Sequence, residues 1–354
     1  MCFIAYNYAK NFEHFGVVND ALSVDSKKGT SSLSNKLSKL NVKSFLTTIN
    51  SLPYLLIVFG ALIIASNHVL ARYLDGTIPP MGLVFWRMVT GALFLAPFTA
   101  YGLFVNRKLI LKHWLLFLIM GALFVPLGNG LIYVSYIYTT AINGGLVSAS
   151  QPAITVLLTW LFFHELINWK QSVGIIIAAI GVLFIITQGE PLAILRLEFN
   201  IGDLVMLAAV VFGAFYNVLI RKVPDEILVS QLLVIVLSSG SLITLPFYIV
   251  ETLYFRPVPF NVFAVFSILW VGIFVTAIAV AMISFSIRRV GANKASVSNY
   301  LRAIFTALLG VVLLGEEFKT FHLTAMVLVI GGVYLMTLGT VIQDDNKKQQ
   351  QEGL

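Results

Sequence analysis

Ten long apolar segments follow one another along the chain from residue 53 to residue 341, and short polar connections separate them. A bilayer core of roughly 30 Å is crossed by about 20 helical residues, which is the typical length of these segments. The segments are continuous rather than alternating, so they predict helices and not the strands of a membrane barrel. We predict an all-α membrane protein with ten transmembrane helices over residues 53–73, 81–104, 113–136, 142–163, 170–187, 203–221, 229–250, 264–287, 293–314 and 320–341.

The two ends of the chain are polar. Residues 1–50 hold six lysines among many Ser, Thr and Asn residues, and they lack the basic-then-apolar order of a signal peptide. We expect a mostly disordered cytoplasmic tail over 1–50, with a short amphipathic helix near Leu33–Leu46, and a second cytoplasmic tail over 343–354. A start codon assigned too early is the alternative explanation for the first tail.

Composition excludes several other classes. Only 11% of the residues are charged and 58% are hydrophobic, so the chain has too little charge to cover soluble domains or to remain disordered. Cys2 is the only cysteine, which rules out a disulfide framework within the chain. The net charge of +7 comes from short basic clusters between apolar segments, so we expect no nucleic acid as a partner.

The basic residues also predict the orientation. If the N-terminus is cytoplasmic, 17 Lys and Arg residues lie on the inner side and four on the outer side, namely Arg72, Arg196, Arg256 and Lys319. Inner loops of membrane proteins carry the excess of Lys and Arg. We therefore expect a multi-pass protein of the inner (plasma) membrane with both termini in the cytoplasm.

The two halves of the chain repeat each other. Residues 69–72 (VLAR) return as residues 218–221 (VLIR), 149 positions later, and Gly91 pairs with Gly240 at the same offset. From the third helix on, the offset is 151. It pairs Gly121 with Gly272, Ser135 with Ser286, Thr155 with Thr306, Glu165 with Glu316 and Gly181 with Gly332. We place the first five-helix repeat at 51–190 and the second at 200–342.

An odd number of helices in each copy makes the second repeat upside down relative to the first. Inverted repeats of this kind are typical of secondary transporters, whose substrate site lies near the middle of the membrane between the halves. The sequence therefore predicts transport by alternating access, with a small molecule as cargo.

Three stretches carry a resemblance to a known family. They are FWRMVTGALFLAPF in the second helix, SASQPAITVLLTWLFFHE in the fourth and its second copy, SVSNYLRAIFTALLGVVLLGEE, in the ninth. The chain resembles the drug/metabolite transporter superfamily, EamA type, over residues 52–342. The resemblance implies a permease for amino acids, drugs or other metabolites, mostly exporting. Where that family usually has a proline in the ninth helix, this chain has Ala303 preceded by Arg302.

Arg302 is the strongest site candidate, because an arginine deep in a membrane is costly to insert and is functional by default. Counted from residue 293, it lies about 14 Å along its helix. Asn299, Tyr300 and Thr306 accompany it, and the repeat places Ser148, Gln151 and Thr155 equivalently in the fourth helix. We expect these two polar stripes to line the substrate route, with Arg302 holding an anionic group. The alternative is an arginine held by carbonyls and hydroxyls for folding alone.

A second group of candidates lies nearer a membrane surface. Arg87 and Trp86 are in the second helix, Asn67 and His68 are in the first, and Tyr216 and Asn217 are the sixth-helix counterparts. These residues are expected either to form an outer rim of the substrate cavity or to be a structural cluster that joins the first two helices. Trp86 and Tyr300, with Tyr133 and Tyr136, are candidates for aromatic walls.

Other chemistry has little support. We find no phosphate-binding lysine motif, no metal-ligand spacing and no catalytic triad, so we expect no cofactor and no enzyme activity. All 16 acidic residues fall in tails, loops or helix ends, which favours facilitated export or exchange over strong proton coupling. The expected partners are a small-molecule substrate, the lipid bilayer and a second copy of the chain. The alternatives are an uptake exchanger for a nucleotide-like or sulfonium metabolite and, more distantly, an intramembrane enzyme.

Overall fold

The computed structural model describes residues 32–164, 167–190, 200–290 and 297–352. The chain divides into two compact units, Met1–Pro53 and Tyr54–Leu354, which we treat separately. Of the predicted N-terminal tail, residues 1–31 lie outside the described part. The described part begins with a helix at Ser32 that covers the stretch where the short amphipathic helix was expected.

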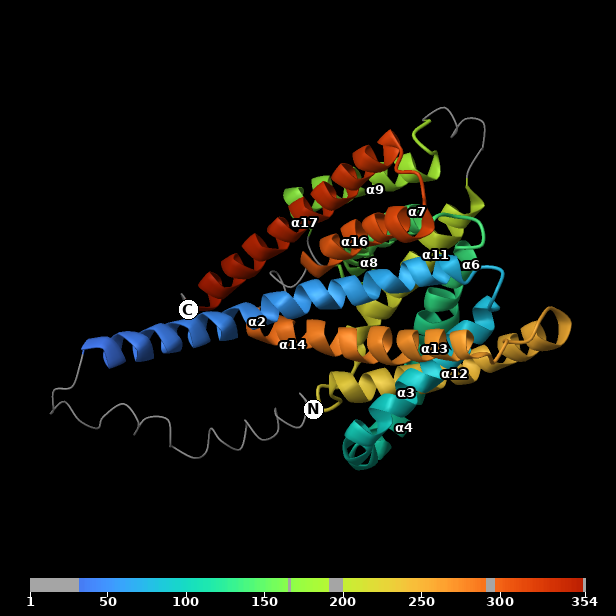
Figure 1. The fold of residues 1–354 in the computed structure, drawn as a ribbon, viewed down its shortest axis with the longest axis horizontal. Coiled ribbons are helices and arrows are strands. Elements are labelled where there is room, and N and C mark those ends of the chain that lie inside the picture. The colour runs from blue at the N-terminus through green and yellow to red at the C-terminus, as the bar shows by residue number, and fades with distance from the viewer. Residues whose placement is uncertain (1–31, 165–166, 191–199, 291–296, 353–354) are drawn as a thin grey trace. The chain divides into compact units, whose positions relative to one another are not determined.

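The described residues are almost entirely helical (Figure 1). The helical elements are α2 (Ser32–Tyr73), α3 (Pro80–Val105), α4 (Arg107–Lys112), α5 (Trp114–Ala122), η2 (Leu123–Gly130), α6 (Leu131–Ser135), α7 (Ala141–Ser148), α8 (Gln151–Phe163), α9 (Trp169–Ile186), α11 (Ile201–Leu219), η3 (Ile220–Lys222), α12 (Val229–Tyr254), α13 (Val262–Leu269), η4 (Trp270–Ala279), α14 (Val280–Val290), α16 (Val297–Leu314) and α17 (Thr320–Glu352).

The prediction of ten transmembrane helices is confirmed. Within the described residues, ten helical spans are long and apolar enough to cross a membrane. They are Leu52–Tyr73, Pro80–Val105, Trp114–Ser135, Ala141–Phe162, Trp169–Ile186, Ile201–Lys222, Val229–Tyr254, Val262–Ser286, Val297–Leu314 and Thr320–Gly339. Each end lies within four residues of its predicted position.

The third and eighth spans each contain a π-helical segment. In the third span η2 connects α5 to α6, and in the eighth η4 connects α13 to α14. Such segments in otherwise α-helical spans often accompany functional sites. Their occurrence in both copies shows that the repeat extends to backbone irregularities.

The fourth and ninth spans differ, although they are repeat partners. The fourth is interrupted at Ala149 and Ser150, between α7 and α8, and Pro152 is the second residue of α8. The ninth is one continuous helix, α16, with Ala303 at the position of Pro152. A proline has no N–H to donate and crowds the preceding turn, so the interruption belongs where the proline is.

Pairs of glycines bring the two halves into close contact. A Cβ atom on Gly240 of α12 would lie 2.7 Å from the Gly121 carbonyl oxygen of α5. A Cβ on Gly91 of α3 would lie 3.1 Å from the Gly272 carbonyl oxygen of η4. Because Gly91 repeats as Gly240 and Gly121 as Gly272, these are two copies of one contact, as an inverted repeat requires.

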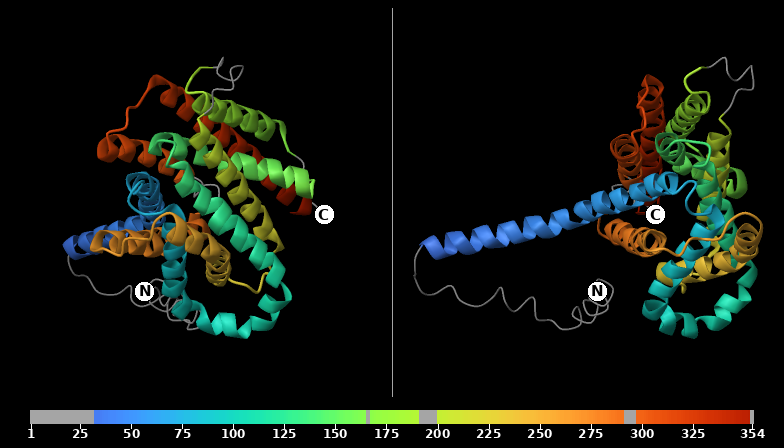
Figure 2. Two further views of the ribbon diagram at one scale, coloured as in Figure 1. Left: turned by 90° about the vertical axis from the view of Figure 1, so that its right-hand side faces the viewer. Right: turned by 45° about the vertical axis from the view of Figure 1, so that its right-hand side comes forward.

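The fifth and tenth spans also pack closely, and α9 and α17 lie side by side in both figures (Figures 1 and 2). Gly332 faces α9, and a Cβ there would lie 2.5 Å from the Ala178 nitrogen. The main buried cluster includes Leu146 of α7, Met206 of α11 and Val329 of α17. Three helices from both repeats thus share one core.

Candidate functional site

The interruption in the fourth span leaves a backbone acceptor free. In a regular helix the N–H of residue 152 would donate to the Ser148 carbonyl, but residue 152 is a proline. The Arg302 guanidinium approaches this carbonyl instead, with its Nη2 3.5 Å from the Ser148 oxygen. The two polar stripes predicted from the sequence therefore meet at this pair.

Arg302 itself is half-buried, and it lies five residues beyond Val297, where α16 begins. That is about 7.5 Å along the helix axis. The sequence-based depth of about 14 Å starts at residue 293, and residues 291–296 lie outside the described part. Among the described residues, no carboxylate lies within ion-pair distance of Arg302. Its charge thus has no counter-charge from the part of the chain that the structure describes.

The other members of the ninth-helix stripe lie in different environments. Thr306 is fully buried and donates to the Arg302 carbonyl, and its methyl group lies against Gly145, where α7 and α16 approach closely. Tyr300 packs against the small cluster that includes Ala153 and Val333, with its hydroxyl 3.3 Å from that of Thr337. Asn299 is half-buried.

The fourth-helix stripe turns toward α11. Ser148 is buried and donates to the Gly144 carbonyl, with Met206 of α11 at 3.6 Å from its oxygen. Gln151 is half-buried, and its amide nitrogen faces Gly213 of α11. Thr155 donates to the Gln151 carbonyl. These hydroxyls are bonded within their own helix, so the Ser148 carbonyl is the group of this stripe that contacts Arg302.

Arg87 lies in a separate, fully bonded cluster. Its side chain is 5% exposed, and it donates to Thr276 at 3.0 Å, Tyr133 at 3.1 Å and Asn67 at 3.3 Å. The Tyr133 hydroxyl also donates to the Asn67 oxygen. These partners come from the first, third and eighth spans, so the contacts fit the structural-cluster interpretation of Arg87.

His68 and Trp86 bond to tyrosines that the sequence did not pair with them. The His68 Nδ1 lies 2.5 Å from the Tyr136 hydroxyl, and both residues are buried. Burial raises the pKa of Tyr136 well above its usual range, and nearby Glu316 adds to this. The phenol therefore stays protonated and donates to His68. The Trp86 indole donates to the Tyr248 hydroxyl at 3.2 Å, linking the second and seventh spans.

Tyr216 and Asn217 do not join this group. Tyr216 lies against the Phe124 ring, in an apolar cluster with Phe117 and Leu232. Asn217 is half-buried near the C-terminal end of α11. His68 lies near the opposite end of the bundle, because repeat partners in inverted halves face opposite ends.

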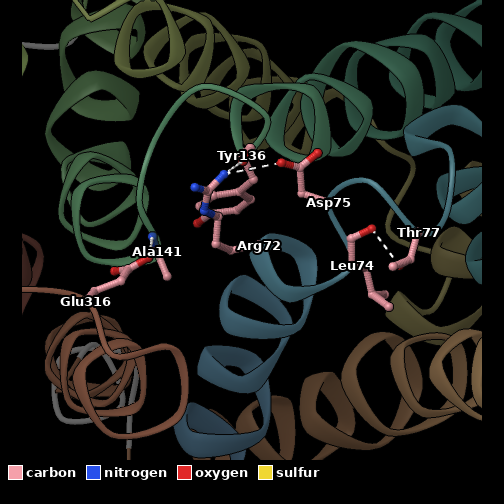
Figure 3. A network of polar contacts seen from close by, with 7 residues as sticks. All are labelled: Arg72, Leu74, Asp75, Thr77, Tyr136, Ala141 and Glu316. Atoms are coloured by element: carbon pink, nitrogen blue, oxygen red, sulfur yellow. Dashed lines mark hydrogen bonds and ion pairs between the residues drawn. The ribbon is translucent and has the colours of Figure 1, made fainter.

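One end of the bundle is closed by contacts between elements of both halves, and we call it the Glu316 end. Glu316 accepts a hydrogen bond from the Ala141 amide at the start of α7 (Figure 3). It accepts a second one from the Ile142 amide. Glu316 is the repeat partner of Glu165, and its own partners are backbone amides. Carboxylates suit this position because the N-terminus of a helix carries partial positive charge.

Further contacts close the same end. Glu251 of α12 accepts from the Met81 and Gly82 amides at the start of α3. Arg72 donates to the Tyr136 carbonyl at 2.5 Å and pairs with Asp75 at 3.4 Å (Figure 3). A small hollow at this end is lined by residues that include Asp75, Pro80 and Tyr133 but no member of the two polar stripes.

Four buried residues near the Glu316 end escaped the sequence analysis. Asp203 of α11 is fully buried and contacts the Thr139 hydroxyl and the Asn143 amide. Asn143 in turn bonds to His322 of α17 at 3.0 Å. Asp203 is the third residue of α11, and a helix-end position gave no sign of burial. The neighbouring Gly202 was the available signal, because it permits close approach of another backbone.

Among the described residues, no three His, Cys, Asp or Glu side chains gather as a metal-binding group would require.

Comparisons with known proteins agree with this architecture. Residues 51–187 and 200–338 each match the EamA-like transporter family. The uncharacterized transporter YyaM of Bacillus subtilis (strain 168) is 26% identical over 299 residues, covering 84% of this chain and 97% of its own length. An uncharacterized transporter of Archaeoglobus fulgidus (strain ATCC 49558) is 24% identical over 81% of this chain and 98% of its own.

One solved crystal structure shares the fold, with a TM-score of 0.50 at 20% sequence identity, covering 80% of this chain and 96% of that one. Two matched repeats, ten apolar spans and full-length relatives named as transporters agree with one another. The chain belongs to the EamA-like transporter family of the drug/metabolite transporter superfamily and is a multi-pass membrane transporter.

Proposed function

We propose that this transporter exports a small polar or amphipathic metabolite that carries an anionic group, and that Arg302 binds that group. The proposal depends chiefly on one observation: Arg302 contacts the Ser148 carbonyl and, among the described residues, no carboxylate. A guanidinium is a strong donor to a carboxylate or phosphate, and those bonds are shorter and stronger than a 3.5 Å bond to a neutral carbonyl. An anionic cargo would therefore displace the carbonyl from Arg302.

The Ser148 carbonyl supports the assignment as well. Once Arg302 turns to the cargo, this acceptor is free to bind an N–H or ammonium group of the same molecule. A donor and an acceptor side by side fit a small metabolite with both kinds of group, such as an amino acid. Discontinuous helices with free backbone groups at their break serve this purpose in other transporters.

The orientation belongs to the same proposal. The excess of Lys and Arg on one side supports a cytoplasmic location for both termini in the inner (plasma) membrane. The Glu316 end then faces outward, and its closure corresponds to a state that admits cargo from the cytoplasm. Alternating access follows when the contacts of the Glu316 end break and those of the opposite end form.

The test compares metabolites inside and outside cells with and without the protein, followed by uptake and efflux assays with labelled amino acids and cationic dyes. Arg302→Ala should abolish net transport while the protein remains folded in the membrane. Arg302→Lys should restore part of the activity if charge suffices, and little if two parallel hydrogen bonds are needed.

Persistent transport by Arg302→Ala would refute the assignment of the anion site. Accumulation of the cargo instead of its exclusion would refute export and favour the uptake exchanger.

A further inference from the structure

Asp203 is a buried carboxyl group that transport through Arg302 does not use. It is the third residue of α11, and its side chain is fully buried at the Glu316 end. On a surface helix this position suits a carboxylate, because the helix dipole favours negative charge there. Burial disfavours the ionised carboxylate, because a charge that is removed from water needs a counter-charge.

The described residues around Asp203 provide no such counter-charge. Within the part of the chain that the structure describes, no Lys, Arg or His side chain lies within ion-pair distance of it. His322 of α17 is linked to Asp203 through Asn143. The other described titratable and charged groups nearby are Lys319 and Glu316, in the connection before α17, and Tyr136, after α6. His322 is bonded as a neutral imidazole, and Tyr136 is a neutral phenol.

A chain of hydrogen bonds that begins at the Lys319 amide fixes which groups donate toward Asp203. The Lys319 backbone N–H donates to His322 Nδ1 at 2.9 Å, so His322 carries its proton on Nε2. Nε2–H then donates to the Asn143 oxygen at 3.0 Å. This orients the Asn143 amide, whose NH₂ donates to Asp203 Oδ2 at 3.1 Å.

The other oxygen of Asp203 contacts a hydroxyl group, which can act either as a hydrogen-bond donor or as an acceptor. Its Oδ1 meets the Thr139 hydroxyl, which can donate to a carboxylate or accept from a carboxylic acid. Gly202 allows this contact, because a Cβ there would lie 2.7 Å from the Thr139 nitrogen. A proton can therefore be added to Oδ1 or removed from it without rearranging the other bonds.

We propose that Asp203 is a proton-binding site that couples the Glu316 end to pH: it holds a proton on Oδ1 while this end is closed and releases it to water when the end opens. The inference rests on the alternating access proposed above and adds a coupling ion to it. The closed state binds one proton more than the open state, so acid favours closure.

The first experiment reads the protonation of Asp203 directly, by infrared spectroscopy of the full-length protein in lipid bilayers as the pH is varied. The parent should show the C=O stretch of a protonated carboxyl, and this band should grow as the pH falls. Asp203→Asn should lack this band, whereas Asp75→Asn, which changes an acid with an arginine partner, should keep it. Thr139→Val retains the carboxyl but removes its partner, so the band should shift in frequency.

The second experiment measures opening, with Ile142→Cys in a Cys2→Ser background and a membrane-impermeant maleimide. Ile142 is 1% exposed in the closed end. Labelling of the parent should slow as the pH falls, by at most about tenfold per pH unit for one proton. Labelling with Asp203→Asn, whose amide imitates the neutral acid, should be slow at every pH.

Identical spectra of the parent and Asp203→Asn, or labelling of the parent that ignores pH, would overturn the proposal. If Asp203→Asn does not fold, two other results test the proposal: the pH dependence of the carboxyl band in the parent and the frequency shift of that band in Thr139→Val. Neither measurement needs the cargo, and Arg302→Ala should leave both unchanged. A failure here is therefore distinguishable from a failure of the anion-site assignment.

Discussion

Arg87 donates to three side chains on three different spans, whereas Arg302 donates to one backbone carbonyl. Both residues are arginines within membrane spans, and their hydrogen-bond partners decide what each one does. Three satisfied bonds hold helices together, and a single long bond leaves a guanidinium available for exchange.

This difference predicts opposite effects of the two alanine substitutions. Arg87→Ala removes the three hydrogen bonds that Arg87 donates to Asn67, Tyr133 and Thr276. Hydrogen bonds between membrane helices average about 0.6 kcal/mol each. We expect the free energy of unfolding to fall by roughly 2 kcal/mol, seen as a lower Tm in detergent. Arg302→Ala should leave the Tm nearly unchanged. Equal Tm values for the two variants would contradict the division of roles.

The candidate residues show where sequence reasoning reaches its limit. The meeting of the two polar stripes was predictable, because the repeat relates Arg302 to Gln151 and Asn299 to Ser148. The partner of Arg302 was harder to predict, because the Ser148 carbonyl is a backbone group that the residue type does not reveal. Asp203 could not be recognised as buried, because His322 is 119 positions away in the sequence and reaches it only through Asn143.

Helices α9 and α17 pack through glycine at their crossing, and this contact gives a prediction at the scale of elements. Gly332→Ala places a Cβ 2.5 Å from the Ala178 nitrogen and 2.6 Å from the Gly174 oxygen, which forces the helices apart. Overpacking of this kind typically costs about 1–3 kcal/mol, so the Tm should fall.

The adjacent glycine is a matched control. A Cβ on Gly331 would meet nothing within 4 Å. Gly331→Ala should therefore leave the Tm unchanged or raise it, since alanine is the better helix former by up to about 1 kcal/mol. Destabilisation by both substitutions would show that the crossing does not depend on close approach at Gly332.

The span boundaries were predictable because each span is a continuous apolar segment bounded by polar residues, as in 229–254 and 320–339. The interruption at Ala149 and Ser150 was not predicted, although a proline such as Pro152 can break a helix. Hydropathy does not reveal such breaks, because Ala, Ser and Pro all occur within membrane helices. The π-helical segments η2 and η4 leave no hydropathy signal for the same reason.

At the scale of the whole molecule, two carboxylates of the second repeat, Glu251 and Glu316, bind helix starts of the first. Such contacts combine capping of free amides with attraction to the helix dipole, together worth about 1–2 kcal/mol. A closed end maintained by a few contacts of this size can open on the timescale of transport.

We therefore expect Glu316→Ala to favour opening of this end. Since 1.4 kcal/mol is a factor of ten in an equilibrium constant, a loss of about 1 kcal/mol should raise labelling of Ile142→Cys roughly fivefold. Glu317→Ala is the control, because Glu317 is exposed and adjacent. Unchanged labelling in Glu316→Ala, or an equal increase in Glu317→Ala, would show that the cap does not hold the end shut.

The bond between Arg302 and the Ser148 carbonyl has no mirror image in this molecule. The repeat partner of Arg302 is Gln151, and the N–H of Ala303 is available to the carbonyl that corresponds to that of Ser148. Two identical halves would make the two opposite conformations equal in energy, but these halves are unequal at their centre. The carrier is thus expected to rest preferentially on one side of its cycle, and its forward and reverse half-saturation concentrations should differ even without a gradient.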